Sequence, residues 1–311
     1  MTAKRRMTFQ QILQDLLAED HPLSYSQLQG LSNLSPEELL AFRASWPGTV
    51  LERRQQVVHA LVHLSEDSPD TNFRDVFVLC LDDPDEDVRI AAIEGLCDDE
   101  SLKLLEHLLG LAAGDPSPEV RSHALLALGR FVYLVETTDL LNTYRQRLLR
   151  LLLQVFHDES APLEIRRRAL ETVSYLSGVP EVEEAIRKAY DDTEREMRAS
   201  AVHAMGHHMS DQWCTFIERE LTSADPQMRY EAAYACGEME NPEMIPLLQP
   251  LLEDADHEVA RAAIWALGEI GGERARRLLE RCVRQASDDL REAAVEALHT
   301  LLFFEDPMQV L

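Results

Sequence analysis

The feature that most constrains the fold is a short signature that recurs along the chain at nearly constant spacing. Each copy has an acidic turn, an aliphatic–arginine pair and a run of small residues that often ends in Leu-Gly. Clear copies are DDPDEDVRIAAIEGLC from Asp82, GDPSPEVRSHALLALG from Gly114 and DADHEVARAAIWALG from Asp254. Self-similarity with a period of about 20–50 residues is typical of solenoid proteins, in which each repeat contacts only its neighbours.

The repeat can be followed through the arginines of the signature. They are 35, 32, 45, 32, 31, 31 and 31 residues apart when Ala260 is counted as the seventh position. One interval is long, and we expect residues 131–157 to lengthen the connection and the first helix of the fourth repeat. The chain is therefore predicted to have eight repeats. The arginines themselves are Arg54, Arg89, Arg121, Arg166, Arg198, Arg229 and Arg291.

Each repeat has the pattern of two helices. The signature forms the second helix, and an amphipathic stretch such as NPEMIPLLQPLLED from Asn241 precedes it. A single hairpin of this size cannot bury its apolar face alone, whereas a stack of hairpins buries a continuous core. We therefore predict an all-α fold, a right-handed α-solenoid (superhelix) of about eight antiparallel helical hairpins. It is expected to span residues 36–303. An N-terminal cap over 1–35, with one amphipathic helix around Thr8 to Leu17, precedes it, and a C-terminal tail over 304–311 follows.

Composition and charge limit the classes of partner. The chain of 311 residues has 56 Asp and Glu against 30 Lys and Arg, which gives a net charge of −26. This charge repels phosphate backbones and anionic lipids, so we expect neither nucleic-acid nor membrane binding. The start of the chain lacks the apolar stretch of a secretory signal, and the five cysteines contain no C-x-x-C pair. The predicted location is the cytoplasm.

Helical periodicity predicts which side chains of the second helices face away from the hairpin core. At about 100° per residue, the positions 4, 7, 8 and 11 residues after the aliphatic of the signature share its buried face. The sixth residue after the aliphatic lies on the opposite side and points away from the hairpin. In the eight repeats this position holds His59, Glu94, Leu126, Glu171, His203, Tyr234, Trp265 and Glu296.

The C-terminal half of this row contains the candidate binding site. Tyr234 and Trp265 occupy equivalent positions in consecutive repeats, so we expect them to be neighbours. Aromatic anchors inside an acidic rim favour a basic or amphipathic peptide as the partner. The alternative, in which the two rings pack on a neighbouring helix, is left open by the sequence. The predicted partner-binding residues are His203, Tyr230, Tyr234, Glu238, Trp265 and Glu269.

Histidines one helical turn apart raise the question of a metal site. His203 and His207 have this spacing, with His208 adjacent, and so do His59 and His63. Two imidazoles can chelate a transition metal, but a lasting site needs a third and a fourth ligand, and no motif in the chain supplies them. We therefore expect surface or rim histidines, with no metal and no cofactor.

The pattern D-P-x-x-x-V-R-x-x-A-x-x-A-L-G on a period near 31 resembles HEAT repeats of the phycobilisome-lyase-like type, over roughly residues 36–303. The resemblance implies that the second helices line a concave face and that the protein is a binding scaffold. It also implies a structural ladder between neighbouring repeats, built from the pairs Asp83 and Arg89, Asp115 and Arg121, and Asp225 and Arg229.

Three other functions are weighed against the scaffold. Deoxyhypusine hydroxylases are similar in length and acidity, but the His-Glu dipeptides that hold their iron are absent here after the signature arginines. DNA-glycosylase-like helical repeats need a cationic track, whereas Arg166, Arg167 and Arg168 are flanked by carboxylates. A bilin lyase-like chromophore-handling subunit remains the alternative, since the repeat type is similar. We expect a non-catalytic scaffold or adaptor with no catalytic residues.

Overall fold

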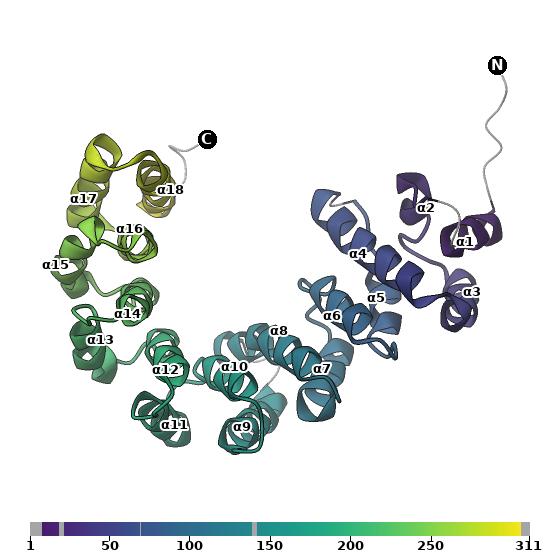
Figure 1. The fold of residues 1–311 in the computed structure, drawn as a ribbon, viewed down its shortest axis with the longest axis horizontal. Coiled ribbons are helices and arrows are strands. Elements are labelled where there is room, and N and C mark those ends of the chain that lie inside the picture. Colours follow the sequence, from purple (N-terminus) through teal and green to yellow (C-terminus); the bar gives the residue numbers. More distant parts are fainter. Residues whose placement is uncertain (1–7, 19–21, 69, 139–141, 306–311) are drawn as a thin grey trace. The chain divides into compact units, whose positions relative to one another are not determined.

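The computed structural model describes residues 8–18, 22–68, 70–138 and 142–305. Within these residues the chain forms helices, turns and loops but no strand. None of the described helices is both long enough and apolar enough to cross a membrane. The chain divides into two compact units, Met1–Phe131 (unit 1) and Val132–Leu311 (unit 2). Each is a stack of antiparallel helical hairpins, so the predicted all-α solenoid class is confirmed (Figure 1).

Unit 1 begins with the predicted N-terminal helix. Thr8 caps α1, with its side chain accepting from the Gln11 amide and the Gln11 side chain accepting from the Thr8 amide. The hairpins α3/α4, α5/α6 and α7/α8 follow. The helices are α1 (Phe9–Leu17), α2 (Tyr25–Gln29), α3 (Pro36–Ser45), α4 (Leu51–Asp67), α5 (Arg74–Cys80), α6 (Glu86–Glu94), α7 (Leu102–Gly114) and α8 (Pro118–Thr137), with a 3-10 turn at Trp46–Gly48.

Unit 2 continues the same alternation. Its second helices α10, α12, α14, α16 and α18 contact one another in order and form the inner row of this unit, while the first helices form the outer row (Figure 1). The helices are α9 (Asn142–His157), α10 (Leu163–Val173), α11 (Pro180–Tyr190), α12 (Arg195–His208), α13 (Cys214–Glu220), α14 (Pro226–Glu238), α15 (Ile245–Leu248), α16 (His257–Ile270), α17 (Gly272–Gln285) and α18 (Asp288–Glu305), with 3-10 turns at Asp211–Trp213, Pro242–Met244 and Gln249–Glu253.

The long interval between repeats lengthens two helices. The first helix of the fourth repeat, α9, has 16 residues, as the sequence predicts. The preceding second helix, α8, has 20 residues, so part of the added length lies in the third repeat. The sequence had predicted it in the connection and in the fourth repeat. The first two residues of the predicted tail over 304–311 belong to α18, which ends at Glu305, and residues 306–311 lie outside the described part of the chain.

Glycines near the ends of the second helices have different roles, which the sequence could not separate. A Cβ atom at Gly206 would lie 2.7 Å from Ala235 Cα, and one at Gly237 would lie 2.9 Å from Ala266 Cα. At Gly268 it would lie 3.0 Å from Ala297 Cβ. These glycines let successive second helices of unit 2 approach closely. In contrast, a Cβ at Gly129 would meet nothing within 4 Å.

The predicted ladder of aspartates and arginines exists, but its pairing is displaced by one repeat. Arg89 donates to both carboxylate oxygens of Asp115, at 2.7 and 2.9 Å, and to the backbone carbonyl of Asp83 at 2.8 Å. Arg229 binds Asp254 in the same bidentate way, at 2.7 and 2.8 Å.

The expected pairs within one repeat were therefore wrong. The carboxylate of Asp83 accepts from Arg54 at 3.0 Å, that of Asp115 accepts from Arg89, and that of Asp225 accepts from Arg195. The physical reason is the reach of the guanidinium, which extends from one second helix to the acidic turn of the following repeat. The same arginine can then use its remaining N–H groups on a carbonyl of its own turn, as Arg229 does on Ser223 at 2.9 Å.

Candidate interaction site

Five aromatic and imidazole rings form a row along the second helices of unit 2. Tyr175 and His207 have ring centroids 4.3 Å apart, and His207 and His203 are also 4.3 Å apart. His203 stacks on Tyr234 at 5.3 Å, and Tyr234 stacks on Trp265 at 4.4 Å with an angle of 8° between the planes. We call this set the ring row. The adjacency predicted for Tyr234 and Trp265 is thus present.

The ring row follows from the period of the repeat. His203, Tyr234 and Trp265 are 31 residues apart, and successive second helices pack side by side, so equivalent side chains meet. The three side chains are half-buried rather than part of the core. The indole of Trp265 lies over Gly237 of the preceding repeat, where an added Cβ would be 2.5 Å from Cζ3. Trp265 therefore packs on its neighbour and still presents surface outside the hairpin.

A pocket of about 420 Å³ opens at the end of the ring row. Its aromatic lining comes from Tyr230, Tyr234 and Trp265. Its charged lining comes from three carboxylates and one guanidinium, with small side chains of α18 on the far side. The charged residues are Glu258, Glu269, Glu296 and Arg261.

The carboxylates of this region lie close enough to affect one another. Burial, together with the charges of Glu238 and Glu240, raises the pKa of Glu269. Burial and the charges of Glu231 and Glu258 likewise raise the pKa of Tyr230. A cation placed in the pocket would relieve this repulsion, because opposite charge stabilises an ionised carboxylate.

The two histidines of the ring row have opposite protonation behaviour. His203 Nδ1 lies 3.1 Å from Glu231 Oε2. Burial opposes its protonation, but this hydrogen bond and the charges of Glu231, Glu171 and Glu238 together raise the pKa of His203. Burial and the neighbouring His203 lower the pKa of His207 to about 3, although His207 Nε2 is 3.8 Å from Glu238. His207 is therefore neutral in the folded protein over the physiological range.

This difference predicts an acid sensitivity that one substitution removes. The pKa of His207 is about 3 in the folded protein and the ordinary 6.5 in the unfolded chain. The free energy of unfolding therefore decreases as the pH falls below 6.5. At pH 5 the loss amounts to about 2 kcal/mol. His203 has the opposite sign, because its raised pKa contributes stability that is present below 6.5 and lost as pH rises through the folded value. The variant His207→Phe keeps an aromatic ring at this position and removes only the acid-dependent loss that comes from His207.

We expect the unfolding free energy of the wild type to fall by about 2 kcal/mol more than that of His207→Phe between pH 7 and pH 5. Urea denaturation followed by circular dichroism at both pH values measures this difference. His63→Phe provides the control, because His63 is exposed with 79 % of its side-chain surface accessible. Parallel pH profiles of the wild type and His207→Phe would contradict the burial of a neutral imidazole.

The histidines do not assemble a metal site. Among the described residues there is no group of three or more His, Cys, Asp or Glu side chains placed to hold an ion. His208 is buried and accepts from Trp213 Nε1 through its Nδ1 at 3.2 Å, so it points away from His203 and His207. The expectation of surface or rim histidines holds for His59 and His63, which are exposed, and for His203, whose side chain is 26 % exposed. It was wrong for His207, whose side chain is 8 % exposed, and for His208, which is buried against Trp213.

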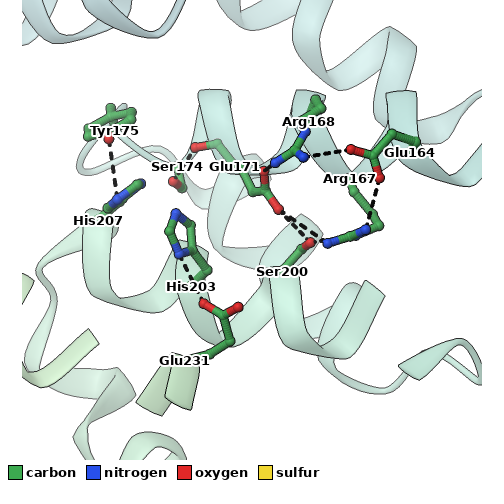
Figure 2. A network of polar contacts seen from close by, with 10 residues as sticks. All are labelled: Glu164, Arg167, Arg168, Glu171, Ser174, Tyr175, Ser200, His203, His207 and Glu231. Atoms are coloured by element: carbon green, nitrogen blue, oxygen red, sulfur yellow. Dashed lines mark hydrogen bonds and ion pairs between the residues drawn. The ribbon is translucent and has the colours of Figure 1, made fainter. Parts of the chain in front are cut away.

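Beside the ring row, Arg167 and Arg168 of α10 are ion-paired (Figure 2), whereas Arg166 donates to the backbone carbonyl of Phe156 at 3.1 Å. Arg167 donates to Glu164 at 2.9 Å and to Ser200 at 2.8 Å. Arg168 lies 2.8 Å from Glu171 and 2.7 Å from Glu164. These guanidinium groups are therefore neutralised by carboxylates of their own helix and do not form a cationic track.

The structure brings four of the six predicted site residues into the pocket: Tyr230, Tyr234, Trp265 and Glu269. The other two lie beside it, since His203 stacks behind Tyr234 and Glu238 faces His207. The sequence analysis counted helical positions from the aliphatic residue of each signature. Glu258 lies one residue before that aliphatic and was therefore missed. Its spacing of seven residues from Trp265, two helical turns, was the available signal.

Comparison with known proteins places this geometry in a family. A profile of HEAT repeats matches residues 74–147 and 215–299, slightly more than half of the chain. No curated protein matches the sequence.

Among solved structures, importin beta in an ammonium sulfate condition is 16 % identical with a TM-score of 0.50, covering 94 % of this chain and 44 % of its own. Kap95p with RanGDP is 14 % identical with a TM-score of 0.52, covering 94 % of this chain and 45 % of its own. This chain thus spans less than half the length of either protein.

Human deoxyhypusine hydroxylase is 16 % identical over 94 % of this chain and 96 % of its own, with a TM-score of 0.35. The likeness to importin beta and Kap95p concerns the fold alone. HEAT-repeat solenoids commonly serve as protein-interaction scaffolds and are usually not enzymes. Since the repeat profile covers more than half of the sequence, the chain belongs to the HEAT-repeat family.

Proposed function

We propose that this protein is a non-catalytic scaffold or adaptor that binds a basic or amphipathic segment of a partner protein. The binding surface is the concave face lined by the second helices of unit 2. One observation carries the proposal: the pocket at the end of the ring row combines exposed aromatic surface with three carboxylates. Aromatic anchors contribute most of the energy at protein interfaces, and complementary charge provides specificity and a fast association rate.

The charge of the protein supports the same partner chemistry. The net charge of −26 attracts basic segments, and this long-range attraction weakens as salt screens it. Much of the acidic charge has a structural use, since aspartates such as Asp83 and Asp115 accept from arginines of the ladder. The carboxylates left to select a partner are those of the pocket and its rim.

The remaining proposals concern context. We place the protein in the cytoplasm, where its five free cysteines would stay reduced. The division into a cap over 1–35, a solenoid over 36–303 and a tail over 304–311 stays a prediction, and so does the phycobilisome-lyase-like repeat subtype.

The bilin lyase-like alternative finds less support at this site. A bilin carries carboxylate side chains, which the acidic pocket would repel. Burial and the neighbouring Cys214 and Glu218 raise the pKa of the Cys236 thiol to about 12, so the cysteine of α14 does not supply the reactive thiolate that covalent attachment needs. The geometry favours a basic protein segment over a chromophore.

Trp265→Ala tests the proposed function. A labelled amphipathic peptide rich in Lys and Arg should bind the wild type at low salt and more weakly at high salt. The variant should bind about ten-fold more weakly or worse, because an aromatic anchor at the centre of the contact is lost. Fluorescence anisotropy measures both effects. Because the indole also packs on Tyr234 and Gly237, the melting temperature should fall, so binding is measured at a temperature where circular dichroism shows the variant folded.

The matched control is Leu126→Ala, which truncates the equivalent position of the third repeat, where the side chain is 47 % exposed. Its affinity for the peptide should equal that of the wild type. Equal affinities of wild type and Trp265→Ala would contradict the proposal. A Trp265→Ala variant that is unfolded at the temperature of the assay would assign the indole to packing instead.

A further inference from the structure

The ring row has an open end. Tyr234 covers one face of the Trp265 indole, and no aromatic ring among the described residues stacks on the other face. In the eighth repeat the equivalent position is Glu296, so the row stops at Trp265. The next second helix, α18, lines the pocket here with Ala293 and Ala297, whose side chains are too short to fill it.

We propose that an arginine side chain of the partner occupies this space. Its planar guanidinium stacks on the free face of Trp265 as the next member of the ring row, and it pairs with the carboxylates of Glu269 and Glu296. This inference rests on the proposed function and deepens it, because it names the side chain that the partner must supply.

Shape favours arginine over lysine. A guanidinium is flat and weakly hydrated, so it can lie on an indole much as Tyr234 does on the other face, where the centroids are 4.4 Å apart. Its N–H groups can also donate to two carboxylates from one position. A lysine ammonium is a compact and strongly hydrated point charge, which gains less from a flat aromatic wall.

The charges around the space also favour a cation. Three carboxylates, those of Glu258, Glu269 and Glu296, line the pocket against the single guanidinium of Arg261. Glu238 and Glu240 add further negative charge close to Glu269, where burial and these charges raise the pKa. An incoming arginine is therefore repelled by one group and attracted by several.

The experiment compares two versions of the labelled amphipathic peptide, one with arginine and one with lysine at every basic position. We expect the arginine version to bind the wild-type protein about three-fold more tightly or better at equal salt. This preference should vanish in Trp265→Leu. It should also vanish in Ala293→Leu, which fills the open end while leaving the indole in place, and circular dichroism verifies that both variants fold.

The Nε1–H resonance of Trp265 provides a second readout. Trp46 and Trp213 are buried, so their indole signals serve as internal references. The arginine peptide should shift the Trp265 signal, which Trp265→Phe assigns. Equal affinities for the two peptides, or a preference that persists in Trp265→Leu, would overturn the arginine site and leave the scaffold proposal intact. If both peptides bound Trp265→Leu as tightly as the wild type, or if neither peptide bound the wild type, both proposals would be overturned.

Discussion

Replacing Arg89 with alanine is expected to lower the free energy of unfolding by about 3–5 kcal/mol. The side chain is 8 % exposed and binds the 4 % exposed carboxylate of Asp115 at 2.7 Å. Removing one partner of such a pair leaves the other charge buried without compensation, and this penalty dominates the loss. The variant also takes away the donor to the carbonyl of Asp83, so two repeats lose a connection at once.

Two further variants separate the ion pair from a general effect of truncation. Arg277→Ala breaks a pair with Glu273 at 3.3 Å, but both side chains are more than 70 % exposed, so the cost should stay below about 0.5 kcal/mol. Combining Arg89→Ala with Asp115→Asn should recover part of the loss, because the neutral amide needs less compensation than a buried charge.

Urea denaturation followed by circular dichroism gives the total effect, and hydrogen exchange of amides in α6 and α7 locates it. A loss for Arg89→Ala as small as that for Arg277→Ala would mean that the ladder does not hold the repeats together. If amide protection decreased only in helices far from α6 and α7, the destabilisation would have a different cause.

The sequence predicted the residues of this ladder but not its pairing. The signature placed an arginine in every repeat except the seventh, and the resemblance to HEAT repeats implied pairs such as Asp83 with Arg89. The actual partner depends on how far a guanidinium extends across the stack, and that distance is set by the rise between hairpins. A repeat period contains no information on this rise, so the displacement by one repeat could only come from coordinates.

The ring row was more predictable, because it depends on register alone. Side chains 31 residues apart meet wherever equivalent helices pack side by side, so Tyr234 and Trp265 had to be neighbours. Their exposure was not predictable, since it depends on Gly237, whose missing side chain makes room for the indole. The pocket was also out of reach, because it needs small residues in α18 as well as aromatic residues in α14 and α16.

The burial of His208 illustrates the same limit. In the sequence it is adjacent to His207 of the candidate pair His203 and His207, and a polar side chain at the end of a helix is expected at the surface. Its actual place depends on Trp213, five residues further along, whose Nε1–H it accepts at 3.2 Å. This hydrogen bond gives the Trp213 N–H and His208 Nδ1 a partner each, while His208 Nε2 stays buried without one.

Gly237→Ala is the second substitution with a large expected effect, and it connects stability to the binding site. The new Cβ would lie 2.5 Å from Trp265 Cζ3 and 2.9 Å from Ala266 Cα. The indole can rotate, but the backbone of α16 moves only if the two helices separate. Such overpacking costs about 1–3 kcal/mol. The displaced indole should also weaken peptide binding, in the same direction as Trp265→Ala.

In contrast, Gly129→Ala should raise the free energy of unfolding. Gly129 lies within α8, and a Cβ there meets nothing within 4 Å. Alanine at a helix interior without a clash gains about 0.5–1 kcal/mol over glycine, because the unfolded chain loses conformational freedom. Urea denaturation of the two variants therefore distinguishes a glycine required by close helix approach from one that is merely tolerated. If Gly237→Ala were as stable as Gly129→Ala and bound the peptide normally, the close contact between α14 and the indole would not exist in solution.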